Sequence, residues 1–148
     1  MYVERSLDSN DALPRHASRP GRLCNPADEF DAGVQVLQLL EQQWSVQDGN
    51  GSLLQVSKGF SYTWDAKRPV GQRVVPGSVR LMGQALAAAG SYRVTVNAYM
   101  ADGGGRLAVF KEGRDARTGM MGVDALEQYV KNNPALGPGT LDRIVRLN

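Results

Sequence analysis

The sequence has few of the residue types on which metal centres, disulfides and nucleophilic triads depend. It contains one cysteine and one histidine among 148 residues, and these are Cys24 and His16. A single thiol cannot form an internal disulfide or a cysteine-only metal clip. The two residues lie close together in a segment without a hydrophobic pattern, so no Cys/His or Ser/His/Asp nucleophile can be assembled from them. We interpret His16 as a solvated residue, and we expect neither a catalytic nor a metal site in this chain.

Long apolar stretches and a strong charge of one sign are also missing. The 17 Lys and Arg residues and 15 Asp and Glu residues leave a formal net charge of +2. This small excess does not indicate a nucleic-acid partner, whereas acidic small molecules remain possible. No apolar run approaches the roughly 20 residues that cross a bilayer, and charges occur throughout Met1 to Pro20, where a signal peptide would have its apolar segment. We therefore expect no membrane segment and see no export signal.

The residues that are present are typical of a single folded domain. A chain of 148 residues with 42% hydrophobic and 22% charged residues is long enough for one sizeable core. The first 30 residues are rich in Arg, Asp, Ser and Pro and sustain no apolar period. We therefore expect an irregular or tail-like segment over residues 1–30 and a folded domain over residues 31–148.

Hydrophobic periodicity predicts both helices and strands in the folded domain. From Gly33 to Trp44 apolar residues recur at helical spacing, and Asp31 is a plausible cap for that helix. A second helix is expected from Val123 to about Asn132. The alternating, β-branched segment from Tyr92 to Val96 is the best strand. Further expected strands are Leu53 to Val56, Phe60 to Trp64, Arg73 to Val75, Ser78 to Met82 and Leu141 to Leu147, and Gln84 to Gly90 is expected to be a connection.

A candidate ligand site follows the strand that ends at Val96. Asn97, Tyr99 and Asp102 are followed there by three consecutive glycines. Glycine lets a ligand approach the backbone, and an aromatic ring offers a flat apolar surface that suits a planar base. The same pattern also fits a flexible turn with Tyr99 in the core, and the spacing alone favours that simpler interpretation.

Four blocks of the folded domain are informative when they are taken in order. They are GVQVLQLLEQQW at 33–44, LLQVSKGFSYTWD at 53–65, VGQRVVPGSV at 70–79 and SYRVTVNAYMADGGG at 91–105. In this order they resemble the C-terminal domain of the 5′-nucleotidases, a family that includes UDP-sugar hydrolases and cyclic-nucleotide phosphodiesterases. The segment VDALEQYVKNN, at 123–133, is similar to the closing helix of that domain. The resemblance extends over about Asp31 to Asn148, and the ordered set is more specific than any single block.

The resemblance implies a layered α/β/β/α domain of the α+β class, with a mixed, largely antiparallel sheet and an N-terminal part that is incomplete or altered. It also implies that the domain recognises a nucleotide or nucleoside. Hydrolysis of the phosphate monoester would belong to an N-terminal metallophosphoesterase domain with two divalent metal ions. Such enzymes serve nucleotide catabolism in the periplasm or outside the cell. We expect this chain to be inactive alone and to work with that domain.

The resemblance further implies which residues hold the base. In the family the base lies between two aromatic rings, and Tyr99 matches one ring position. The second ring lies near the segment from Gln55 to Phe60, where the register is open and Phe60 is the best aromatic candidate. The predicted substrate-binding set is Tyr99, Phe60, Asn97, Asp102, Gly103 and Gly104.

Two departures from the family pattern leave other functions open. The family loop reads Gly-Gly-Asp-Gly, with the Asp near the base or sugar, but Gly105 stands at that position here, and Asp102 compensates only if the loop is drawn differently. Nothing from Met1 to Phe30 matches the family's upstream Asn-Gly-Gly-Gly-Ile-Arg segment. The chain could therefore be a non-catalytic interaction module, derived from this domain, that has lost ligand binding.

A third possibility is binding of single-stranded nucleic acid through Tyr62, Trp64, Lys67 and Arg68. The small net charge argues against it. Phe60, Tyr62 and Trp64 also alternate along one strand, so at least one face of this strand has to pack against the core.

Overall fold

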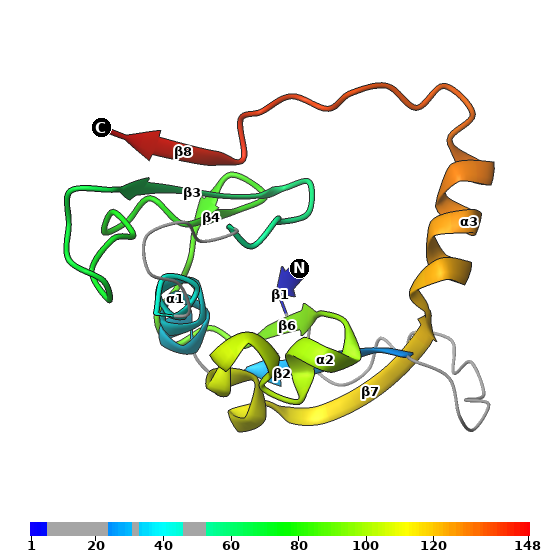
Figure 1. Ribbon diagram of the computed structural model, residues 1–148, viewed down its shortest axis with the longest axis horizontal. Helices are drawn as coiled ribbons and strands as arrows, with labels where there is room; N and C mark the ends of the chain where they lie inside the picture. Colours follow the sequence, from blue (N-terminus) through cyan, green and yellow to red (C-terminus); the bar gives the residue numbers. More distant parts are fainter. Residues whose placement is uncertain (6–23, 31–32, 46–52) are drawn as a thin grey trace.

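Two four-stranded sheets and several helices make up the part of the chain that the structure, a computed structural model, describes, namely residues 1–5, 24–30, 33–45 and 53–148 (Figure 1). The first sheet contains, in spatial order, β1 (Tyr2–Arg5), β6 (Tyr92–Thr95), β2 (Cys24–Phe30) and β7 (Arg114–Met121). The second contains β5 (Gln84–Ala85), β4 (Arg80–Leu81), β3 (Phe60–Asp65) and β8 (Ile144–Leu147).

Strand pairing is mixed but mostly antiparallel. In the first sheet β6 pairs antiparallel with β1 and β2, and β2 pairs antiparallel with β7 with shifts of register. In the second sheet β4 pairs antiparallel with β3 and β5, whereas β3 and β8 are parallel. A parallel pair needs a long crossover, and here the chain passes through the first sheet between β3 and β8. The predicted α+β fold with a mixed, largely antiparallel sheet is confirmed.

Helix α1 (Gly33–Gln42) lies at one side of the molecule, where it meets the core (Figure 1). It begins at Gly33, as predicted, and buries Val36, Leu39 and Leu40 along one face, which is the i, i+3, i+4 pattern of an amphipathic helix. Glycine is required at position 33, because a Cβ atom there would overlap the carbonyl oxygen of Ala87. The close approach lets α1 sit directly against the connection before β6.

The core combines side chains from both sheets with α1. Strand β3 buries every second residue, Phe60, Tyr62 and Trp64, so this alternation marks a core face, as expected of at least one face of the strand. Each fully buried aliphatic or aromatic side chain contributes about 1.5–3 kcal/mol through the hydrophobic effect. The buried hydrophobic residues are Val36, Leu39, Leu40, Trp44, Val56, Phe60, Tyr62, Trp64, Val74, Val79, Tyr92, Val94, Val96, Leu107, Val109 and Phe110.

The burial of β3 removes the rings that the nucleic-acid alternative needs. Tyr62 is 1% exposed and Trp64 is 8% exposed. The Trp64 ring centroid lies 5.3 Å from that of Trp44, and the guanidinium of Arg146 lies 5.4 Å from the Trp64 centroid. A base cannot stack on rings that other side chains already cover, so this arrangement contradicts that alternative.

The expectation of an irregular segment over residues 1–30 is wrong for two stretches. Tyr2–Arg5 and Cys24–Phe30 form strands β1 and β2, which flank β6 on either side. Strand pairing satisfies backbone hydrogen bonds whatever the side-chain pattern, so the lack of apolar alternation was misleading there. His16 and Asp31 lie outside the described residues, and the domain boundary at residue 31 stays a prediction.

Several expected strands are shorter than predicted or differ. Leu53 to Val56 is irregular, and Arg73 to Val75 reduces to a single bridge between Val74 and Trp64. The segment Ser78 to Met82 contains only β4, and the expected connection from Gln84 begins with the two-residue strand β5. The expected strand Leu141 to Leu147 is observed as β8 over Ile144–Leu147.

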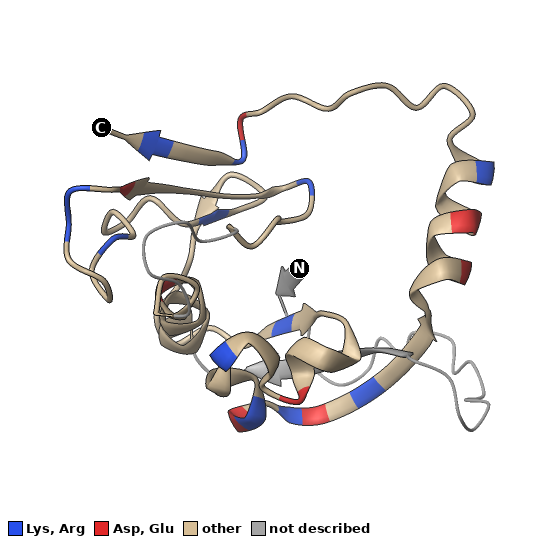
Figure 2. Cartoon of the chain, viewed as in Figure 1, with Lys and Arg blue, Asp and Glu red and all other residues tan. Residues whose placement is uncertain are grey.

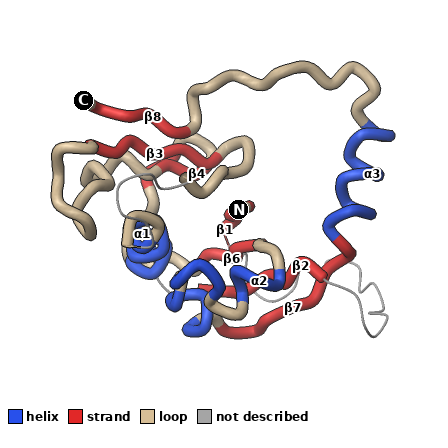
Figure 3. The backbone as a smooth tube through the Cα atoms, viewed as in Figure 1, coloured by secondary structure: helices blue, strands red, loops and turns tan. Residues whose placement is uncertain are grey.

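Helix α3 (Gly122–Asn132) stands apart from both sheets (Figure 1). It confirms the helix predicted from Val123 to about Asn132, but its apolar side is exposed. The exposed fractions are 62% for Val123, 61% for Leu126, 56% for Tyr129 and 48% for Val130. A long loop then leads to β8 in the second sheet (Figure 3). Among the described residues, no helix is long and apolar enough to span a membrane.

Candidate functional site

The chain turns sharply after β6 into the short helix α2 (Ala98–Ala101). Asn97 caps this helix, because its Oδ1 accepts a hydrogen bond from the Met100 N–H at 2.9 Å. The helix ends at Asp102, whose N–H donates to the Ala98 carbonyl at 3.0 Å. The cap fixes the direction in which α2 leaves the sheet. Tyr99 consequently points outward and is 67% exposed.

The glycine loop folds back over Tyr99. The Gly105 N–H donates a hydrogen bond of 3.0 Å to the Tyr99 hydroxyl. A Cβ atom at Gly104 would lie 2.6 Å from the Tyr99 ring and would overlap the backbone carbonyl oxygen of Tyr99, so only glycine fits there. Gly103 and Gly105 both have left-handed backbone conformations, with φ of 77° and 66°, which glycine adopts without strain. The loop therefore holds the tyrosine ring in place while much of it stays open to solvent.

The exposure of Tyr99 bears on one part of the simpler interpretation of the glycine run, the placement of Tyr99 in the core. A core tyrosine would be buried, as Tyr62 and Tyr92 are, but Tyr99 is among the large hydrophobic residues that stay exposed. This part of the simpler interpretation is therefore wrong. An aromatic ring that is held by its own loop and is left accessible is suited to stacking on a planar ligand.

A cavity of about 370 Å³ lies next to Asn97. Thr95, Val96 and Asn97 form one wall, and Gln55, Val56, Ser57 and Met1 form the rest. The Met1 amino group donates to the Gln55 carbonyl at 2.7 Å, and burial lowers the pKa of this amino group. The Ser57 hydroxyl oxygen is inaccessible to solvent and has no hydrogen-bond partner among the described residues. Gln55, Val56 and Ser57 thus line the same cavity as Asn97, and they belong to the segment near which the resemblance implies a second ring.

Phe60 does not join this site as a second stacking ring. It has 0% exposure and belongs to the hydrophobic core, whereas Tyr99 lies on the surface. The phase of the alternation in β3 places Phe60 on the same buried face as Tyr62 and Trp64. In this conformation its ring has no free face for a base. Asn97, Tyr99, Asp102, Gly103 and Gly104 follow one another in the segment that runs from the N-cap of α2 into η1.

Lys111 is a residue of the loop region that the sequence did not single out. It lies in the 3₁₀ helix η2 (Ala108–Glu112), which follows η1 (Gly104–Arg106). A Cβ atom at Gly103 would lie 2.7 Å from Lys111 Cε and 3.5 Å from its Nζ, so the lysine side chain covers this glycine. No periodic or motif signal marks the segment, and only its folding back onto the loop brings a positive charge here.

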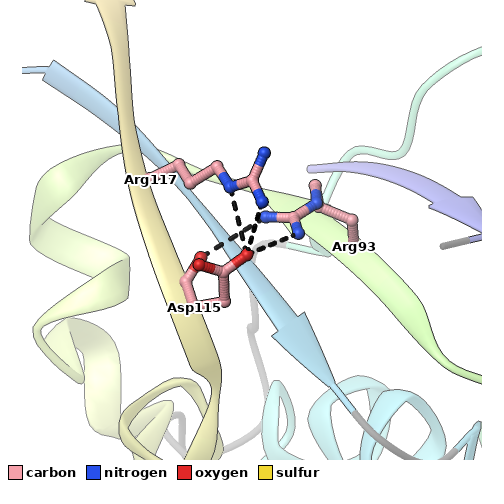
Figure 4. Close-up of polar contacts among 3 residues, drawn as sticks. All are labelled: Arg93, Asp115 and Arg117. Atoms are coloured by element: carbon pink, nitrogen blue, oxygen red, sulfur yellow. Dashed lines mark hydrogen bonds and ion pairs between the residues drawn. The ribbon is translucent and has the colours of Figure 1, made fainter. Parts of the chain in front are cut away.

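A second polar cluster ties β7 to β6 across β2 (Figure 4). One carboxylate oxygen of Asp115 accepts from Arg93 at 3.1 Å and from Arg117 at 2.7 Å. Hydrogen bonds from Arg117 and then Arg93 lower the pKa of Asp115. Arg93 is largely buried, with 11% side-chain exposure. This cluster fixes the edge strand, and we assign it no ligand.

The donor atoms in the described residues do not assemble a metal centre. In residues 1–5, 24–30, 33–45 and 53–148 no group of three or more His, Cys, Asp or Glu side chains could hold a metal ion. The resemblance assigns the two divalent ions to the N-terminal metallophosphoesterase domain and not to this chain.

The fold and the loop define an α+β domain that presents a tyrosine beside a glycine turn at the end of a central strand. The family model for the 5′-nucleotidase C-terminal domain matches residues 32–112. The chain therefore belongs to the family of 5′-nucleotidase C-terminal domains, and the resemblance seen in the four sequence blocks is confirmed. The matched region includes both walls of the Asn97 cavity except Met1, whereas α3 and β8 lie beyond it.

Solved structures support the same assignment. A 5′-nucleotidase precursor from Thermus thermophilus is 28% identical, with a TM-score of 0.66 over 85% of this chain. A candidate 5′-nucleotidase from Staphylococcus aureus, in complex with alpha-ketoglutarate, is 20% identical over 98% of this chain, with a TM-score of 0.62. Sulfate thiohydrolase SoxB from Thermus thermophilus, in complex with glycerol, is 18% identical over 85% of this chain, with a TM-score of 0.58. The last two show the fold alone.

This chain is much shorter than these solved proteins. It covers 25%, 32% and 23% of their respective lengths. Comparison with curated proteins gives no match.

Proposed function

We propose that this chain recognises the nucleoside part of a nucleotide, with Tyr99 stacking on the base. The observation that carries the proposal is the accessible Tyr99 ring, which is 67% exposed and is fixed by the 3.0 Å hydrogen bond from Gly105. Stacking of a base on an aromatic side chain contributes about 1–3 kcal/mol. Fixing the ring beforehand lowers the entropy that binding would otherwise lose.

The polar residues of the loop complete the proposed site. The helix cap uses the Oδ1 atom of Asn97. The side-chain NH2 group of Asn97 could therefore donate hydrogen bonds to a sugar or base beside the cavity. The Asp102 carboxylate is exposed and could accept a hydrogen bond from a sugar hydroxyl. Gly103 and Gly104 give a ligand access to the backbone, and Lys111 adds a positive charge beside them. We leave Phe60 out of the site because its ring is buried.

Catalysis is assigned to another region in this proposal. We infer that hydrolysis of the phosphate monoester takes place in an N-terminal metallophosphoesterase domain, where two divalent ions would hold the phosphate and supply a hydroxide nucleophile. The assembled hydrolase would serve nucleotide catabolism in the periplasm or outside the cell. Hydrolysis of AMP at an enzymatic rate by the purified chain with added divalent metal would contradict this division of labour.

A second candidate function is that of a non-catalytic interaction module without ligand binding. Two observations favour it. Gly105 occupies the loop position at which the family has a carboxylate, and the buried Phe60 leaves the site with a single predicted ring. A single ring, with no carboxylate at position 105, would support only weak binding.

Titration of the isotope-labelled chain with AMP and with adenosine separates the two functions. Nucleoside recognition predicts amide shifts that centre on residues 97–105. Tyr99→Ala should weaken binding by roughly 5- to 150-fold, which corresponds to the loss of one stacked ring worth about 1–3 kcal/mol. Tyr129→Ala is the matched control, since Tyr129 is also exposed, at 56%, but lies on α3. The absence of shifts at millimolar ligand would support the interaction module instead.

A further inference from the structure

A second cavity, of about 420 Å³, opens at the second sheet. It lies where the parallel strands β3 and β8 begin and where the turn between β4 and β5 approaches them. The side chains of Lys58, Ser61, Thr140, Asp142 and Arg143 line it, together with glycines 59, 83 and 139. Neither Tyr99 nor the glycine loop contributes to it, so it is separate from the proposed nucleoside site.

Positive charge exceeds negative charge at this cavity. Lys58 and Arg143 are cationic, and Asp142 is the acidic residue of the lining. One oxygen of Asp142 already accepts a hydrogen bond of 2.9 Å from the Thr140 hydroxyl. Basic residues also occur on β4 and β8, the strands on either side of β3 (Figure 2). The local field therefore favours an anion.

The two cations keep hydrogen-bond donors free for a ligand. Within the part of the chain that the structure describes, the Lys58 ammonium has neither a hydrogen bond nor an ion pair. Arg143 uses Nη1 for a 3.0 Å hydrogen bond to the Val56 carbonyl. Its Nη2 has no hydrogen bond among the described residues, and Gly139 lies beside it. A guanidinium fork and an ammonium are the groups that proteins use to hold phosphate and carboxylate.

Hydrogen bonds fix the turn between β4 and β5 where it borders the cavity. The Met82 N–H donates to the Gly59 carbonyl at 2.6 Å, and Arg80 donates to the Gly83 carbonyl at 3.1 Å. Met82 and Gly83 both have positive φ, 51° and 79°, as a two-residue hairpin turn requires. The Met82 sulfur occupies the space beside Gly59, only 2.5 Å from where a Cβ would stand. A wall that is already ordered does not lose further entropy when a ligand binds.

We propose that this cavity binds a phosphate group, held by Lys58 and Arg143. Its volume of about 420 Å³ falls within the range of small-molecule pockets, roughly 300–1,000 Å³, so it admits a phosphate ester of a small organic molecule as well as inorganic phosphate. Asp142 faces the same space and disfavours ligands with several negative charges spread along them, such as a polynucleotide. The site does not depend on the proposed nucleoside recognition.

Two probes test the proposal on the isotope-labelled chain, inorganic phosphate and glycerol 3-phosphate, each at constant ionic strength with chloride as the reference. Binding is expected to shift the amides of residues 58–61, 83 and 139–143 and to leave residues 97–105 unchanged. Tighter binding of glycerol 3-phosphate identifies an ester as the preferred ligand, and equal binding identifies the phosphate group itself. This pattern of shifts is distinct from that expected with adenosine, so either proposal can fail without the other.

Lys58→Gln removes one cation without breaking a described contact, so folding should be unaffected. It should weaken phosphate binding by about 3- to 10-fold, the effect of one partly exposed charge-assisted hydrogen bond. Lys67→Gln is the matched control, because Lys67 is also exposed and lies outside the cavity lining. Equal weakening by both substitutions, or shifts that do not exceed those with chloride, would overturn the proposal.

Discussion

Tyr62 illustrates how one buried polar group depends on its neighbours. Its ring is 1% exposed, and its hydroxyl lies 3.3 Å from Nε2 and 3.4 Å from Oε1 of Gln43. Burial raises the pKa of Tyr62 above its ordinary value of 10.0, and the hydrogen bond to Gln43 offsets part of this rise. The folded state therefore prefers the neutral phenol more strongly than the unfolded state does.

A pH dependence follows from the raised pKa of Tyr62. The stability that comes from keeping the phenol neutral is fully present below pH 10.0 and is lost as the pH rises through the folded-state pKa. Tyr62→Phe should therefore flatten the loss of stability between about pH 9 and 12. Denaturant unfolding across that range measures the slope. Tyr129→Phe, at an exposed site, serves as the control, and equal slopes for both variants would contradict the explanation.

The candidate site shows which residue properties can be read from a sequence. The cluster of Asn97, Tyr99, Asp102 and glycines after a strong strand was sufficient to locate the loop. The alternation of Phe60, Tyr62 and Trp64 showed that these rings share a face, but not whether that face meets the core or a ligand. That choice is made by Trp44, Val74 and Val79, which pack into the same core from distant parts of the chain. Lys111 was missed for the same reason, because only folding brings it over Gly103.

At the scale of elements, Gln43, the residue that follows α1, links this helix by hydrogen bonds to Leu54 and to Tyr62 of β3. It is 5% exposed, its Oε1 accepts the Leu54 N–H at 2.9 Å, and its Nε2 donates to the Leu40 carbonyl at 2.6 Å. The irregular segment that follows position 53 has no strand partner of its own. Its backbone therefore depends on this side chain for one of its hydrogen bonds.

Gln43→Ala should lower the free energy of unfolding by about 1–3 kcal/mol, because it leaves a partly buried N–H without an acceptor. Gln38→Ala is the matched control within α1, since Gln38 is exposed and the change should stay within about 0.5 kcal/mol. Urea unfolding of both variants gives the comparison. A Gln43→Ala cost no larger than that of Gln38→Ala would show that water replaces the side chain.

Elements whose apolar residues recur at helix or strand spacing could be predicted from the sequence. Strands that are held by pairing with a neighbouring strand could not. Helices α1 and α3 and strands β3, β6 and β8 carry apolar repeats that indicate their type. Strand β7 has the sequence RDARTGMM, and its residues are exposed apart from a half-buried Met121, so neither alternation nor burial marks it. It pairs with β2, which was also missed. Strand β7 is held by backbone pairing with β2 rather than by a buried face.

At the scale of the whole molecule, the two proposed sites lie on different sheets. The tyrosine loop follows β6 in the first sheet, and the phosphate cavity lies at the start of β3 and β8 in the second. The shared core between the sheets contains residues of β3 and β6. Because this core is already packed, a ligand at one site should not change the conformation of the other sheet. We therefore expect the two sites to bind their ligands independently.

Helix α3 has the amphipathic pattern of α1, but its apolar side is exposed and so should contribute little to the stability of the fold. Leu39 of α1 and Leu126 of α3 are both leucines within helices, but Leu39 is 0% exposed and Leu126 is 61% exposed. Leu39→Ala should lower the free energy of unfolding by about 2–5 kcal/mol, because it removes buried methyl groups and leaves a cavity. Leu126→Ala should change it by no more than about 0.5 kcal/mol. Since the change in intrinsic helix propensity is the same at both sites, thermal or urea unfolding reports the difference in packing directly. A large cost at Leu126 would mean that α3 packs against another surface in solution.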